Sequence, residues 1–137
     1  MDVSGLNFTT FYVHSEGKKW ENETSLNIFG YSNKKLIYPG KIGKYKFFIK
    51  NDEDSDVKYS IIFGSSTNLN VKMLYRFRSE SDYLAGLHNE WIALDNIDSD
   101  YYSNKKSTDC YILEWKFVDN YDLDSGFYTL NVKVVNR

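Results

Sequence analysis

The chain has 137 residues, 42% of them hydrophobic and 18% aromatic, and its 17 basic and 19 acidic residues give a formal net charge of −2. A chain of this length forms one domain that buries roughly two-thirds of the surface its unfolded form exposes, so it needs no disulfide to fold. The balanced charge argues against nucleic acid or an anionic membrane as the main partner, because both require a basic face.

The sequence shows no segment for membrane insertion or export. No apolar run approaches the ~18 residues of a membrane span. The first residues, Met1 to Gly5, lack the charged start and apolar core of a signal peptide. We therefore expect either an intracellular protein or a mature exported protein whose signal has been removed, with no membrane segment in the mature form.

The first predicted strand, Leu6–Val13, is followed by a polar connector from His14 to Thr24. Alternation divides the strand into two faces, with Leu6, Phe8, Thr10 and Tyr12 on one and Asn7, Thr9, Phe11 and Val13 on the other. Aromatic residues occur on both faces, so the pattern does not fix how the strand pairs. The connector is long enough for the strand to reach away from its own domain. We therefore divide the chain into an N-terminal segment, residues 1–24, and a β-sandwich domain, residues 25–137.

A short predicted strand over Ser25–Phe29 precedes the clearest pattern in the chain. Pro39 and Gly40 stand at the two central positions of a type II turn, in which glycine accepts the positive φ. Beyond the turn, buried and solvent-facing positions alternate as Tyr45, Phe47 and Ile49 against Lys44, Lys46 and Lys50. An acidic hairpin loop, Asn51 to Asp56, leads into a second alternating strand with Val57, Tyr59, Ile61 and Phe63 on one face. A period of two predicts half-buried strands of an antiparallel sheet.

The rest of the chain repeats this pattern at similar spacings. The predicted elements are a strand over Val71–Arg78, a helical turn over Ser79–Leu87, a short edge strand or loop anchor over Trp91–Leu94, and strands over Ser107–Val118 and Gly126–Val135. About seven or eight strands with almost no helix predict an all-β fold, a two-sheet sandwich of jelly-roll or immunoglobulin-like topology.

Residue types that carry catalysis or bind metals are scarce and scattered. The two histidines, His14 and His88, belong to no zinc-binding spacing, and no GxSxG motif or phosphate-binding glycine loop is present. The acidic loops around Asp54 and Asp122 lack the spacing of a calcium loop, so we expect them to be solvated. Cys110 lies in an alternating strand, where we expect it to be buried as a small apolar residue. We therefore predict no enzyme activity, no cofactor and no metal site.

Aromatic residues in connectors are the candidates for ligand binding. Trp20 and Trp91, with Tyr101 and Tyr102 nearby, are candidates for a carbohydrate platform, whereas Trp115 alternates with core residues. These rings support one reading of the function, a carbohydrate- or surface-ligand-binding β-sandwich module.

Several segments, taken in order, carry a family resemblance. They are Leu26–Phe29, Ile37–Tyr45, Phe47–Asn51, Val57–Phe63, Tyr75–Phe77, Tyr111–Phe117 and Tyr128–Val134. The most specific pieces are the Pro-Gly-Lys-x-Gly turn at residues 39–43, which leads into a strand ending Lys50-Asn51, and Thr108–Trp115, which ends in Leu-Glu-Trp. From Ser25 onward, the chain resembles the TasA and camelysin-type exported proteins of Gram-positive bacteria, and most of all their clostridial branch.

This resemblance implies a secreted, jelly-roll-like structural protein of the biofilm matrix, located in the extracellular matrix or at the cell surface. Members of that family polymerise by donor-strand exchange, in which the N-terminal strand of one subunit completes the sheet of the next. The candidate donor residues here are Leu6, Phe8, Thr10, Phe11, Tyr12 and Val13. The implied partners are further copies of the chain, joined head to tail, or related matrix subunits. The other interpretation of this strand is that it folds into its own domain.

Overall fold

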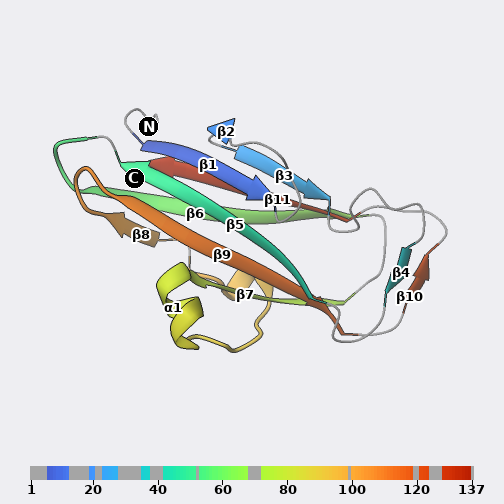
Figure 1. Ribbon diagram of the computed structural model, residues 1–137. Helices are drawn as coiled ribbons and strands as arrows, with labels where there is room; N and C mark the ends of the chain where they lie inside the picture. Colours follow the sequence, from blue (N-terminus) through green and yellow to red (C-terminus); the bar gives the residue numbers. More distant parts are fainter. Residues whose placement is uncertain are drawn as a thin grey trace.

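The structure of the chain is a computed structural model that describes residues 6–12, 19–20, 23–27, 35–37, 42–51, 53–67, 72–98, 100–118, 121–123 and 128–136. For the ranges before residue 42, and for residues 121–123, only the backbone pairing is described. Two stacked antiparallel sheets form the body of the molecule, with a small ribbon at one end and a short helix on an outer face (Figure 1).

The larger sheet has five described strands in the order β2-β1-β5-β9-β7. Their bounds are β1 Leu6–Tyr12, β2 Lys19–Trp20, β5 Ile42–Asn51, β7 Met73–Ser79 and β9 Thr108–Phe117. The smaller sheet, in the order β3-β11-β6-β8, contains β3 Glu23–Asn27, β6 Val57–Thr67, β8 Asp100–Ser103 and β11 Tyr128–Asn136. The remaining elements are the ribbon of β4 Lys35–Ile37 and β10 Tyr121–Leu123, helix α1 Glu80–Ala85 and the 3-10 turn η1 Leu94–Asn96.

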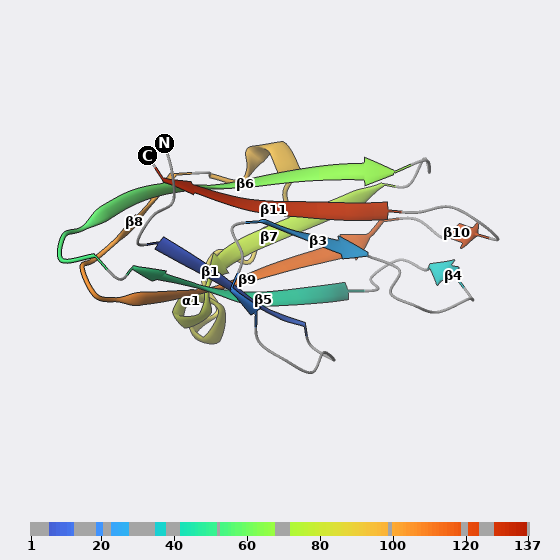
Figure 2. The ribbon, with the colours of Figure 1, turned by 90° about the horizontal axis from the view of Figure 1, so that it is seen from above.

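Strands that follow one another in the chain mostly alternate between the two stacked sheets (Figure 2). β3 pairs with β11, β5 with β9 and β6 with β8, so that the pairs are nested around β7. Nested pairing wraps the chain around the sandwich in the manner of a jelly roll. The predicted all-β, two-sheet sandwich is confirmed, and the nesting favours the jelly-roll alternative over the immunoglobulin-like one.

The predicted strand boundaries agree with the structure to within a few residues. The expected strand at Ser25–Phe29 corresponds to β3, which begins two residues earlier at Glu23, and Val71–Arg78 corresponds to β7. The short strands β2, β4, β8 and β10 were not predicted, because two to four residues show no periodicity. The expected type II turn at residues 38–41 lies outside the described residues.

The acidic loop after β5 is not a hairpin loop, contrary to the sequence prediction. β5 and β6 belong to different sheets, so the residues between them cross the sandwich. Asn51, which is fully buried, organises this crossing. Its Nδ2 lies 3.1, 3.4 and 3.0 Å from the carbonyl oxygens of Ser55, Ser103 and Asn104, and its Oδ1 accepts a hydrogen bond from the Glu53 amide at 2.9 Å. One buried amide therefore ties the crossing to the turn between β8 and β9.

The alternating residues of the long strands build the core between the sheets. Tyr45, Phe47 and Ile49 of β5 are at most 1% exposed, and Trp115 of β9 is also buried, as predicted. Buried tyrosine hydroxyls satisfy one another: Tyr75 and Tyr128 are 2.6 Å apart, and Tyr59 pairs with Tyr111. Burial raises the pKa of Tyr111 to about 12. These hydroxyls therefore stay protonated and hydrogen-bonded at neutral pH.

β9 is buried on both of its faces, which the alternating pattern did not predict. Ile112 and Glu114, on the face away from the core, are only 2% and 4% exposed. Helix α1 lies on this side of the sheet (Figure 1). It begins after Ser79, whose hydroxyl caps the Asp82 amide at 3.2 Å, and it ends at Gly86 in the left-handed region, with φ of 73°. The predicted helical turn is thus confirmed, and it serves as a cover for β9.

Gly43 of β5 leaves room for a core side chain. It stands opposite Trp115 of β9, and a Cβ built on Gly43 would lie 2.1 Å from the indole Nε1. The buried indole therefore packs directly on the glycine backbone, as aromatic residues do when they cover a strand glycine.

We expect Gly43→Ala to displace the indole and to lower the free energy of unfolding by about 1–3 kcal/mol, the usual cost of overpacking a core. Urea unfolding followed by tryptophan fluorescence measures the change. The matched control is Gly64→Ala in β6, where nothing lies within 4 Å of an added Cβ. Equal effects of the two substitutions would contradict the packing.

Candidate functional site

The candidate donor strand β1 pairs with β5 of its own chain. The antiparallel register runs over seven positions, from Leu6 opposite Asn51 to Tyr12 opposite Tyr45. The candidate donor residues with register partners on β5 are Leu6, Phe8, Thr10, Phe11 and Tyr12. Val13, the remaining candidate, lies outside the described residues. Of the two interpretations that the sequence left open, the single chain therefore adopts pairing in cis.

β5 requires a neighbour on the side that β1 occupies. On its other side, β5 pairs with β9 over nine positions, from Ile42 opposite Lys116 to Lys50 opposite Thr108. Its inward residues are almost completely buried. Without β1, the backbone N–H and C=O groups of Lys46, Phe48 and Lys50 that face it would lose their partners, and the exposed edge would recruit another strand.

The far side of β1 is covered over only part of its length. β2 pairs with β1 at two positions, Thr9 opposite Trp20 and Thr10 opposite Lys19. Within the described part of the chain, five of the seven β1 positions therefore have a strand neighbour only in β5. The interaction that holds β1 in the sheet is thus mainly its ladder with β5.

The opposite edge of the same sheet is β7, and it is partly closed. Tyr75 exchanges two backbone hydrogen bonds with Ile92, at 2.8 and 2.7 Å. The expected edge strand at Trp91–Leu94 is thus a single bridge followed by η1. Phe77, two residues further along β7, points its backbone N–H and C=O to the same side as Tyr75, away from β9. No described residue pairs with them.

A cleft of about 770 Å³ opens beside this part of β7, and we call it the β7 cleft. It lies between β7, the segment 88–98 and the start of β8. Its floor contains Phe77, Tyr101 and Tyr111, and its rim contains Asp82, Glu90, Asp98 and Asp100. Sequence reasoning missed this cleft, because it depends on which strands form the sheet edges.

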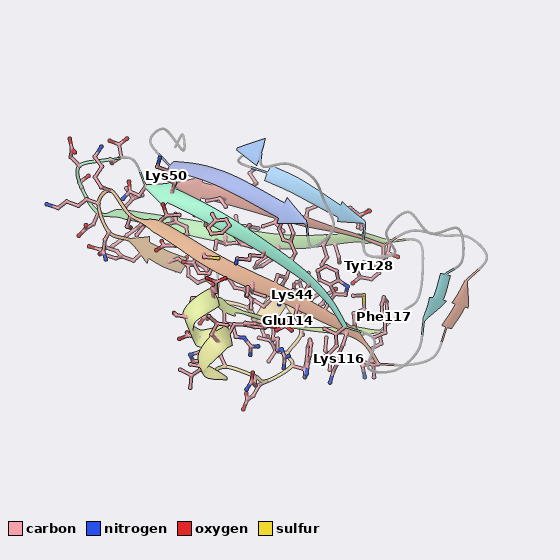
Figure 3. The ribbon with its side chains drawn as sticks, viewed as in Figure 1. Lys44, Lys50, Glu114, Lys116, Phe117 and Tyr128 are labelled. Atoms are coloured by element: carbon pink, nitrogen blue, oxygen red, sulfur yellow. The ribbon has the colours of Figure 1, made fainter. Side chains whose placement is uncertain are left out.

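A buried ion network closes the inner wall of the cleft. Arg76 binds both carboxylate oxygens of Glu114, at 2.8 and 3.2 Å, and Arg78 Nη2 binds Oε1 at 3.1 Å. Arg78 Nη1 also donates to the carbonyl oxygens of Leu87 and His88, each at 3.1 Å. Figure 3 shows Glu114 and Lys116 on β9, on the side where α1 lies. The network therefore fastens the segment after α1 to the sheet.

The proposed ligand aromatics are largely engaged within the chain. Trp91 is half-buried, with the Arg76 guanidinium 4.2 Å and the Lys116 ammonium 4.7 Å from its ring centroid. Tyr101 packs against Phe77 and Tyr111, so it belongs to the core rather than to an exposed platform. Tyr102 is exposed, but its hydroxyl donates to Asp56, which lowers the pKa of that carboxyl. Trp20 lies in β2, and its side chain is outside what the structure describes.

A carbohydrate would therefore have to displace a cation from Trp91, and Tyr101 is packed against the core. The rings do not come together into one platform in the described part of the chain.

Cys110 is half-buried rather than fully buried as expected. Burial, followed by the charge of Glu80, raises the pKa of its thiol to about 11. The thiol is therefore protonated at neutral pH and a poor nucleophile. Among the described residues, no three His, Cys, Asp or Glu side chains are placed to hold a metal ion, and no helix is long and apolar enough to cross a membrane.

No protein-family model matches the chain, and no curated protein matches it. The function must therefore be argued from the strand edges and from the chemistry around them.

We expect Glu114→Gln to lower the free energy of unfolding by about 2–4 kcal/mol, because it leaves two arginines without their buried counter-charge. Chemical unfolding in urea measures the loss. The control is Glu53→Gln on the exposed crossing loop, which should change stability by less than about 0.5 kcal/mol. If Glu114→Gln behaves like this control, the network does not stabilise the fold.

Proposed function

We propose that the protein is a structural subunit of an extracellular fibre, and that it assembles by exchanging β1 between copies. The observation that carries this proposal is the seven-position ladder between β1 and β5. We further propose that this fibre is part of a biofilm matrix. The biofilm assignment rests on the sequence resemblance to TasA and camelysin-type proteins.

Exchange of β1 keeps the ladder that β1 makes with β5 in cis. A β1 strand from a second copy can occupy the same slot beside β5, in the same register, so the ladder is lost in one subunit and regained in the next. The difference in free energy between the two forms then depends on the connector and on the concentration of subunits, rather than on new contacts. Assembly is therefore controlled by concentration.

The connector has the reach that exchange requires. Ten residues separate Tyr12, the end of β1, from Glu23, the start of β3. Fully extended, which breaks the two-position pairing of β2 with β1, ten residues span roughly 35 Å, about the diameter of a small domain. A strand released from its own sheet can therefore reach a neighbouring subunit.

The geometry of such a contact produces filaments. One subunit contributes β1, and the next contributes the edge of β5, so the two surfaces are different. A contact between different surfaces does not close on itself unless the rotation forms a ring, and it otherwise propagates as an open chain. Each subunit in the chain donates one strand and accepts one strand.

We expect the concentrated full chain to form filaments, and a chain beginning at His14 to form none, because it lacks the donor strand. Size-exclusion chromatography with negative-stain microscopy compares the two. Near-ultraviolet circular dichroism checks that each chain is folded.

A pair of point variants isolates the ladder from the rest of β1. Thr9→Pro removes a backbone N–H that faces β5 in the middle of the strand, whereas Thr9→Val keeps it and favours a strand. Thr9→Val should polymerise like the native chain, and Thr9→Pro should not. The proposal would be contradicted if the chain beginning at His14 formed filaments as readily as the full chain, or if every chain stayed monomeric at high concentration.

A further inference from the structure

We propose that the β7 cleft is a recognition groove for an extended, lysine- or arginine-bearing peptide segment of a partner protein, bound as an added strand along β7. This site lies at the opposite edge of the sheet from the β1 slot, so it does not depend on strand exchange.

The backbone of β7 supplies the first part of the site. Tyr75 is already paired on its outer side by Ile92, and Phe77 continues the same row with an N–H and C=O that no described residue pairs. An incoming strand can continue the line that Ile92 begins and bond to both groups. This is the usual mode of strand addition, in which the main chain contributes affinity and alternate side chains contribute specificity.

The floor of the cleft suits an apolar or aliphatic side chain. The ring of Phe77 stacks on Tyr111 with a centroid distance of 5.2 Å, and Tyr101 meets both rings edge to face at 5.8 and 5.4 Å. Ile92 and Ile97 also line the cleft. Side chains from alternate positions of an added strand would point toward these rings.

The charges around the cleft select a basic occupant. Four acidic residues line it, namely Asp82, Glu90, Asp98 and Asp100. The two arginines that line it, Arg76 and Arg78, are both bound to Glu114. His88, the remaining basic residue there, lies 3.6 Å from Asp82. The cleft therefore carries net negative charge, which attracts lysine and arginine and repels an acidic strand.

The test uses the full chain and a fluorescein-labelled peptide of eight residues that alternates lysine and valine, measured by fluorescence anisotropy. Two control peptides separate the contributions. One alternates glutamate and valine, and the other is the lysine peptide with a methyl group on every backbone amide, which leaves neither edge with an N–H donor for a ladder. We expect the lysine peptide to bind at least tenfold more tightly than either control.

Two protein variants locate the binding site. Glu90→Gln combined with Asp98→Asn removes two rim charges and should weaken binding about tenfold. Glu53→Gln combined with Asp54→Asn removes two exposed charges on the crossing loop and should have no effect beyond twofold. The proposal is overturned if the lysine peptide does not bind, if methylation leaves its affinity unchanged, or if the two double variants weaken it equally. The last result would show general attraction to an acidic protein instead of a groove.

Discussion

The structure depends on hydrogen-bonded strands on both sides of β5, which are β1 and β9. The inward residues of β5 are at most 1% exposed, so this strand lies within the core rather than at its margin. A strand in such a position cannot leave one row of amides and carbonyls unpaired without cost. β9 pairs with one row of these backbone groups. At the end of that ladder, Asn51 ties the crossing loop to the turn between β8 and β9. β1 satisfies the other row, and a ten-residue connector is all that separates it from β3.

This arrangement makes the two edges of the five-stranded sheet different in kind. On one side, β1 is a whole strand, and we propose that an identical strand from another copy can take its place beside β5. On the other side, β7 is fixed, because its Arg76 and Arg78 bind Glu114 of β9 and donate hydrogen bonds to the segment after α1. That segment covers β7 at Tyr75 and leaves it open at Phe77. The first edge therefore suits assembly of like subunits, and the second suits recognition of a short segment with different chemistry.

The sequence allows the sandwich to be predicted but not its edges. Alternation in β5, β6, β9 and β11 identifies the residues that face the core, since burial of one face imposes a period of two. It cannot show that β5 and β6 lie in different sheets, because both sheets impose the same period. It also treats Arg76, Arg78 and Glu114 as solvent-facing, since the contacts of the two arginines outside the sheet are with α1 and the segment after it. The β7 cleft was missed for the same reason, while the β1 strand was found because its apolar residues precede a polar connector.

The central claim is that β1 of one subunit occupies the β5 slot of the next in the polymer. Thr9 of β1 stands opposite Phe48 of β5, so cysteines at these positions report the contact directly. Both substitutions are made with Cys110→Ser, and chains carrying Thr9→Cys are polymerised with an equal amount of chains carrying Phe48→Cys, then oxidised. The account predicts disulfide-linked pairs of chains in the polymer, and an internal disulfide in monomers that carry both cysteines. Polymers that yield no linked pairs, while the double-cysteine monomer still closes its internal bond, would contradict it.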